Sequence, residues 1–239
     1  MAFPQIADTT DDEQGGTSAS PHTISFPATV GVGDLLVAVA GFGVGSQITT
    51  WPSPWTKIGD YEMAGNESTM SVAYMEAVGD EDATTFELSF DGDSSRRALV
   101  LYRITGWESS LPPEVSTIAT GTSTAPDPAS LTASWGSADN LWIEFMCGES
   151  GATDMTTQST GFSTPDNSAE DGTGTGGAAV CWASDENATA TLDADAMVSS
   201  ASEPWMAGMI VIAPTGAAAA AAGGFPLVGG VGLVGVPNG

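Results

Sequence analysis

The chain has very little positive charge. Its 239 residues include 30 acidic side chains but only 4 Lys and Arg, among them the single lysine Lys57, and the formal net charge is −26. Binding to nucleic acid depends on basic side chains that displace counterions from phosphates, which argues against nucleic acid as a partner. Two interpretations stay open: an acidic surface with no specific partner, or one adapted to brine, to cations or to a basic partner.

Groups suited to catalysis are also scarce. His22 is the only histidine, and no serine stands in a Gly-x-Ser-x-Gly turn, so we expect neither a catalytic triad nor a histidine-based metal site. Acidic residues are so abundant that a carboxylate pair, as glycosidases use, gives no specific signal. We therefore expect that the protein is not an enzyme, with a carboxylate-dependent hydrolase as the least favoured function.

The chain has only two cysteines, Cys147 and Cys181, and both lie in strand-like runs. Buried thiols are the favoured interpretation, and a cross-strand disulfide is the alternative if both runs belong to one sheet. The N-terminus has no basic segment followed by an apolar one. We therefore expect no signal peptide, and a protein that stays in the cytoplasm until assembly or lysis.

Short apolar and alternating runs make up most of the chain before residue 215. The most strand-like run spans residues 96–107, and a second run of the same character spans 206–214. Strands of this length, with turn residues about every 8 to 12 positions, are typical of an all-β sandwich or barrel. No stretch before residue 215 has a sustained helical period, so we predict an all-β fold.

The strand pattern occurs twice in the same order, although antiparallel β proteins in general resemble one another at this level. The corresponding segments are 33–38 and 138–145, 72–76 and 180–184, 83–88 and 188–192, and 99–102 and 209–212. Because a single small sheet needs a second layer, we predict one antiparallel, jelly-roll-like β-sandwich of two stacked layers over residues 1–214, rather than two independent domains. Its two halves span about 20–107 and 130–213. The predicted core residues are Leu36, Val39, Tyr74, Phe86, Leu99, Leu101, Leu141, Ile143, Trp182, Ile210 and Ile212.

Two tryptophans, Trp51 and Trp55, stand in a proline-rich loop. Proline excludes a central strand there, and the favoured interpretation is that both indoles cap one end of the core. The alternative is a glycan-binding site, because an aromatic pair in a loop can stack on a sugar ring. Phe162, in a long loop of small polar residues in the second half, would then contribute to that site.

Two acidic turns place carboxylates close together. One contains Asp80 and Asp82, and the other contains Asp91 and Asp93. Ca²⁺ prefers several such oxygen ligands, but neither turn completes an EF-hand pattern. Solvated turn carboxylates are therefore the favoured interpretation, Ca²⁺ is the alternative, and no other cofactor is expected.

The C-terminal segment 216–239 has no charged side chain. Glycines and prolines interrupt it and no basic residue flanks it, which argues against a transmembrane helix and against membrane insertion. Its spaced apolar residues favour an extended Gly/Ala-rich arm over 215–239 that docks in a groove of a neighbouring subunit, with a disordered tail as the alternative. The predicted docking residues are Phe225, Leu227, Val228, Val231, Leu233, Val234 and Val236.

Several structural motifs follow one another along the chain: a strand ended by proline at 23–30, Gly-Asp-Leu-Leu at 33–36, Pro-Trp-Thr at 54–56, Val-Ala-Tyr at 72–74, and an aromatic and arginine-containing strand that ends in glycine at 97–106. This order resembles a β-sandwich domain common in structural proteins of tailed bacteriophages, over about residues 20–214. The resemblance implies an exterior virion component of the capsid decoration, fibre or tail type. The acidic surface departs from the ordinary member and suggests a marine or halophilic host.

The expected function is therefore that of a structural protein in the virion, assembled in the host cytoplasm, which forms a homo-oligomer and contacts other capsid or tail proteins through its arm. The alternative is a receptor-binding β-sandwich module that recognises a polysaccharide on the host surface.

Overall fold

The computed structural model describes residues 1–14, 21–43, 47–63, 68–91, 96–148, 154–171 and 177–219. Within these ranges the regular structure is β-strand and contains no helix, so the predicted all-β class is confirmed. It follows that the described chain has no helix long and apolar enough to cross a membrane.

The first half of the chain forms two antiparallel sheets. The large sheet contains, in spatial order, β1 (Gln5–Gln14), β8 (Arg97–Thr105), β3 (Leu35–Phe42), β6 (Thr69–Glu76) and β5 (Thr56–Glu62). The small sheet contains β2 (His22–Ser25), β7 (Thr85–Asp91) and β4 (Gln47–Thr50).

The second half is built in the same way. Its large sheet contains β10 (Ala119–Ser123), β18 (Glu203–Ile212), β12 (Asn140–Gly148), β15 (Ala178–Asn187) and β14 (Asp166–Asp171), with β9 (Glu114–Val115) beside β18. Two short ribbons accompany it, β11 (Leu131–Thr132) with β16 (Thr191–Leu192) and β13 (Met155–Thr157) with β17 (Val198–Ser199). The order of the five main strands in this sheet matches that in the first half, strand for strand.

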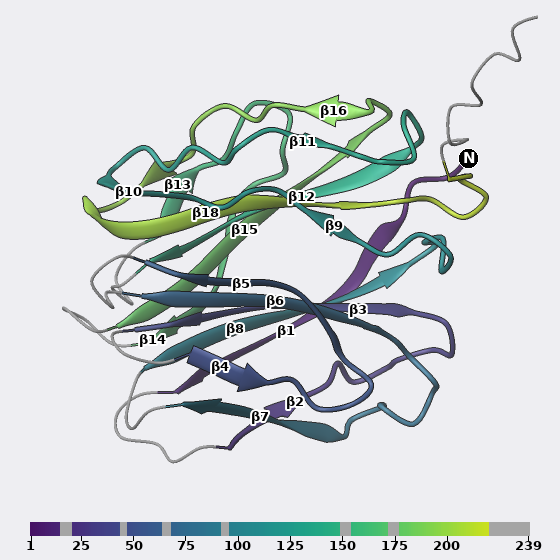
Figure 1. The fold of residues 1–239 in the computed structure, drawn as a ribbon, viewed down its shortest axis with the longest axis horizontal. Helices are drawn as coiled ribbons and strands as arrows, with labels where there is room; N and C mark the ends of the chain where they lie inside the picture. The colour runs from purple at the N-terminus through teal and green to yellow at the C-terminus, as the bar shows by residue number, and fades with distance from the viewer. Residues whose placement is uncertain are drawn as a thin grey trace, which may run out of the picture.

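The sheets are stacked as layers (Figure 1), with the two large sheets in the middle and the small sheet or ribbons of each half on the outside. One apolar cluster lies between the large sheets, and each half has a second cluster beneath its outer layer. The predicted face-to-face packing of antiparallel sheets is confirmed, but the number of layers is four and not two. Both faces of each large sheet are covered, and for this reason β3 and β12 are buried at every position.

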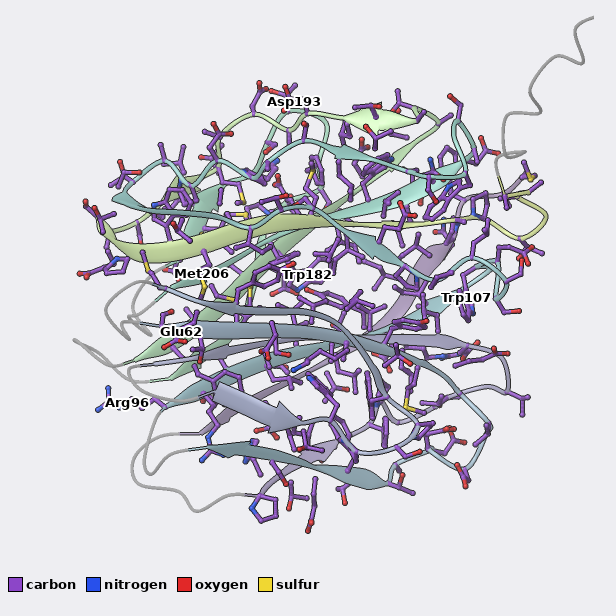
Figure 2. All side chains as sticks on the ribbon, in the orientation of Figure 1. Glu62, Arg96, Trp107, Trp182, Asp193 and Met206 are labelled. Atoms are coloured by element: carbon purple, nitrogen blue, oxygen red, sulfur yellow. The ribbon has the colours of Figure 1, made fainter. Side chains whose placement is uncertain are left out.

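The predicted core residues are buried, except Tyr74, which is partly buried. They divide between two of the clusters. Trp182 lies between the large sheets (Figure 2), where its ring meets the edge of Tyr102 at a centroid distance of 5.0 Å. Leu36 and Phe86, in contrast, belong to the cluster of the first half alone.

Cys147 and Cys181 lie on neighbouring strands of one sheet, but their side chains point to opposite faces. Cys147 belongs to the cluster between the large sheets and Cys181 to the outer cluster of the second half. The two sulfurs form no disulfide, so the cross-strand bridge considered from the sequence is wrong and the interpretation as buried thiols is confirmed. Burial raises the pKa of the Cys147 thiol well above its usual range, which keeps it protonated and unreactive.

The Gly-Asp-Leu-Leu motif fixes the turn before β3. Gly33 has a positive φ of 82°, which glycine adopts without strain, and its carbonyl accepts a hydrogen bond from the Trp107 indole at 2.8 Å. The Asp34 carboxylate accepts one hydrogen bond from the Gly31 amide at 2.7 Å and one from Arg103 Nε at 2.6 Å. The motif therefore stabilises the end of the large sheet.

Candidate functional site

The two loop tryptophans lie inside the core of the first half. Trp51 and Trp55 are each 8% exposed, their ring centroids are 5.2 Å apart, and both pack against Phe86. The Trp51 indole N–H donates a hydrogen bond to the Ser71 hydroxyl at 2.9 Å. Both indoles therefore cap the core of the first half, as the favoured interpretation of the sequence expects.

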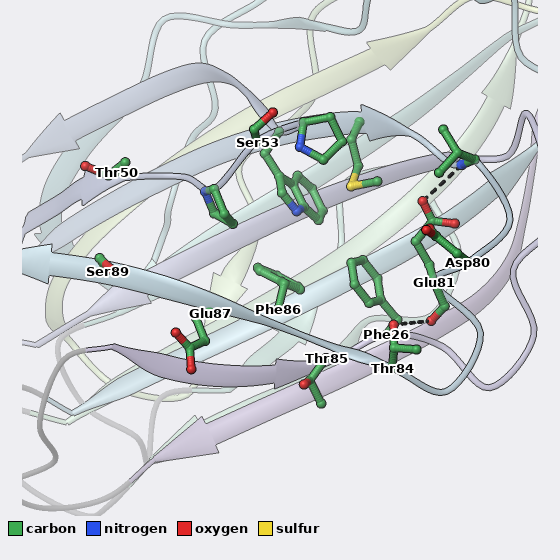
Figure 3. A pocket seen from close by; sticks show the side chains of 15 residues that line it. Phe26, Thr50, Ser53, Asp80, Glu81, Thr84, Thr85, Phe86, Glu87 and Ser89 are labelled. Atoms are coloured by element: carbon green, nitrogen blue, oxygen red, sulfur yellow. Dashed lines mark hydrogen bonds between the residues drawn. The ribbon is translucent and has the colours of Figure 1, made fainter.

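A groove of about 820 Å³ lies beside Trp55, between the loop that follows β4 and the strand β7 (Figure 3). Its apolar lining consists of Phe26, Trp55, Met75, Val78 and Phe86, with Pro52 and Pro54 from the loop. Its polar lining consists of Thr50, Ser53, Thr84, Thr85, Ser89, Asp80, Glu81 and Glu87. Trp51 does not line it, so of the two tryptophans only Trp55 reaches this surface.

One wall of the groove is a strand edge. On one side, β7 pairs with β2 from Thr85 to Leu88, and on the other it pairs with β4 only from Ser89 to Asp91. Among the described residues, no strand therefore pairs with β7 on the β4 side between Thr85 and Leu88. This wall offers backbone donors and acceptors to whatever occupies the groove.

The rim of the groove carries negative charge. The side chains of Asp80 and Glu87 are exposed, whereas Glu81 is 4% exposed and accepts hydrogen bonds from the amides of Val78 at 2.9 Å and Gly79 at 2.7 Å. Glu81 therefore holds the turn together, and the other two carboxylates face solvent. A negatively charged ligand would be repelled.

Of the two acidic turns that could bind calcium, the one with Asp80 and Asp82 lies within the described residues. The Asp82 carboxylate accepts a hydrogen bond from the Val30 amide, so it stabilises a turn, and Asp80 is exposed. The side chain of Asp91 and the whole of Asp93 lie outside the described residues. Within those residues no group of three His, Cys, Asp or Glu is placed to hold a metal ion.

Phe162 lies in the second half of the fold, whereas the two tryptophans lie in the first half. It is 6% exposed and belongs to the outer cluster of the second half, with Met155 and Met197. Trp51 and Trp55 belong to the cluster of the first half, so the three aromatic residues do not form one site. The seven predicted docking residues of the arm, from Phe225 to Val236, lie outside the described residues.

His22 is 8% exposed and its Nε2 lies 2.6 Å from Asp12 Oδ1, so this contact joins β2 to the edge strand β1. The contact between His22 and Asp12 therefore holds the two sheets of the first half together.

Glu144 is a buried acid that no motif in the sequence had singled out. It is fully buried in the middle of β12, where its Oε1 accepts a hydrogen bond from the Ser159 amide at 3.0 Å and its Oε2 lies 2.5 Å from the Ser159 hydroxyl. Burial raises the pKa of this carboxyl, although the bonds from Ser159 act in the opposite direction. The signal in the sequence was a lone acid within the apolar run 140–148.

No family model, no curated protein and no solved structure matches the chain. Function must therefore be inferred from the chain's own residues.

Proposed function

We propose that the chain is a structural subunit on the exterior of a tailed-phage virion, of the capsid decoration, fibre or tail type, which assembles with its own copies and with other virion proteins through its C-terminal arm. The motif order described above supports the virion setting. The small amount of apolar surface that the folded body exposes supports assembly through the arm.

The observation that carries this proposal is how little apolar surface the described body exposes. Its exposed large apolar side chains are Met1, Val32, Val78 and Val198, and both large sheets are covered on both faces. Stable association normally needs an apolar patch, and two bodies of this charge repel each other. The segment 216–239 has no charged side chain and carries Phe, Leu and Val side chains on a Gly/Ala-rich backbone, so it can supply that apolar surface instead.

Removal of the arm tests the proposal. A chain that ends at Ala219 keeps every residue of the four layers, and we expect it to fold with an unchanged melting temperature, to remain monomeric and to be absent from assembled particles. A matched control replaces 220–239 with a Gly/Ser segment of equal length, which keeps the length but removes the apolar side chains. Normal incorporation of either variant into particles would contradict the proposal.

A second candidate function is recognition of a host-surface polysaccharide, and the groove beside Trp55 favours it. Hydroxyl and carboxylate side chains surround an aromatic floor there, a combination suited to a neutral or amine-bearing sugar. Glycan-array binding that is lost in Glu87→Ala, with the fold intact, would support it. Absence of binding to any host polysaccharide would remove it.

A further inference from the structure

We propose that the groove beside Trp55 receives the C-terminal arm of a second copy of this chain, which pairs with the open edge of β7 as an added strand. This inference rests on the proposed assembly through the arm and assigns the surface that accepts it.

Alternate backbone groups of β7 point toward the groove. In an antiparallel pair, residues alternate between those that bond to the partner strand and those that point away from it. The Phe26 amide donates to the Thr84 carbonyl at 2.9 Å, so two and four residues further along, Phe86 and Leu88 also face β2. The backbone groups of Thr85 and Glu87 therefore face the groove, where the described residues give them no strand partner.

The aromatic rings of the groove are placed to suit a peptide better than a sugar. Phe26, Trp55 and Phe86 are each 8% exposed because they pack on one another, with Phe26 and Trp55 parallel to within 9°. A sugar that stacks on an aromatic ring needs an open ring face, and rings that are only 8% exposed leave little of a face open. An extended peptide instead uses the strand edge for hydrogen bonds and the apolar floor for its side chains.

Charge also favours the arm. Asp80 and Glu87 lie exposed on the rim, and all 30 acidic side chains of the chain precede residue 216, so the acidic segments of a second copy would be repelled. The arm has no charged side chain from residue 216 to residue 239. It can enter the groove without that repulsion.

The pattern of the arm suits an added strand. Pro226 and Pro237 bracket the proline-free segment 227–236, so each residue of that segment has an N–H that can pair with the short open edge of β7. Within it, Val231 and Leu233 are two residues apart and point to the same face of an extended strand. From Ala219 to Val231 an extended chain spans up to about 40 Å, which is enough to leave its own body and reach a neighbour.

The test uses the chain that ends at Ala219 and a synthetic peptide of residues 225–239, with binding measured by calorimetry and tryptophan fluorescence. We expect saturable one-to-one binding. Replacement of both Val231 and Leu233 by Asp in the peptide should weaken binding at least about tenfold, because it buries charge beside the acidic rim. These peptide variants leave the folded body unchanged.

Substitution in the groove then locates the site. Glu87→Pro removes an N–H that faces the groove but none that bonds to β2, and we expect it to weaken binding at least about tenfold. Glu87→Thr, the matched control, removes the same charge but keeps the N–H, and it should bind as the unaltered body does. Melting curves confirm that both variants fold, and if Glu87→Pro does not, Ser53→Trp, which fills the groove from its exposed loop, replaces it.

Every result of these binding measurements either supports the inference or overturns it. Failure of the peptide to bind, or equal binding to the blocked groove, overturns the inference, whereas the proposed role of the arm in assembly is judged separately by particle incorporation of the truncated chain. A full-length chain that stays monomeric in light scattering, while the peptide binds the truncated body, shows docking on the arm's own body and overturns the role of a second copy. A polysaccharide that binds the groove of the full-length chain, with no competition from the peptide, also overturns it.

Discussion

Replacement of the buried Glu144 by Gln should make the protein more stable at neutral pH. The Ser159 hydroxyl lies 2.5 Å from Glu144 Oε2 and 2.5 Å from the carbonyl oxygen of Asp195, yet it has one hydrogen to donate. Both contacts of Ser159 Oγ are hydrogen bonds when the Glu144 carboxyl is protonated. The carboxyl then donates to Ser159 Oγ, and the Ser159 hydroxyl donates to the Asp195 carbonyl. The side-chain amide that Glu144→Gln introduces reproduces that pattern, because its NH₂ donates to Ser159 Oγ and its oxygen accepts from the Ser159 amide.

The size of the stability gain from Glu144→Gln follows from the linkage between proton binding and folding. Burial raises the folded-state pKa of Glu144 above its unfolded value of 4.5, so the folded chain keeps a proton that the unfolded chain releases. Stability from this group is complete below pH 4.5 and is lost as the pH rises through the folded-state pKa. Each unit between the two values lowers the free energy of unfolding by about 1.4 kcal/mol, a loss that Glu144→Gln lacks.

Urea denaturation from about pH 4 to about pH 8 measures the difference between the variant and the unaltered chain. We expect the difference to grow from about pH 4.5 upward and to level off above the folded-state pKa. Asp193→Asn is the control, because Asp193 is exposed on the outer side of the second half (Figure 2) and its replacement removes one negative charge without affecting a buried carboxyl. A stability difference that does not change with pH, or that falls as pH rises, would refute this reasoning.

Three further predictions concern packing and hydrogen bonds, and thermal or urea denaturation measures each. Tyr102→Phe should raise the free energy of unfolding by about 1 kcal/mol, because the buried hydroxyl has no hydrogen-bond partner among the described residues, and a loss of stability would contradict this. Gly208→Ala should lower it by about 1 to 3 kcal/mol, because the added Cβ would overlap Ile118 Cδ1, and an unchanged midpoint would show that the contact relaxes. Asp34→Ala should lower it by about 1 to 3 kcal/mol, because Arg103, whose side chain is 19% exposed, loses its carboxylate, and a neutral result would show that the ion pair adds nothing.

The candidate site was only partly visible in the sequence. Trp55 stood out as an aromatic residue in a proline-rich loop, but its apolar partners in the groove, Phe26, Met75, Val78 and Phe86, lie about 20 to 30 residues away on either side in the chain. β7 pairs with β2 along one stretch and with β4 along the next. These pairings depend on long-range register, which local composition does not encode. The open edge between Thr85 and Leu88 could therefore be found only in the folded chain.

The sequence by itself determined where most strands lie and that their order repeats, because alternation and continuous apolar runs are local consequences of a strand covered on one face or on both. It also determined the acidic surface and the uncharged arm. The tertiary structure alone decided that there are four layers, that Cys147 and Cys181 face opposite ways, and that Glu144 is buried. These features depend on which sheet covers which face, and segments of similar pattern can pack in several ways until all of them are placed together.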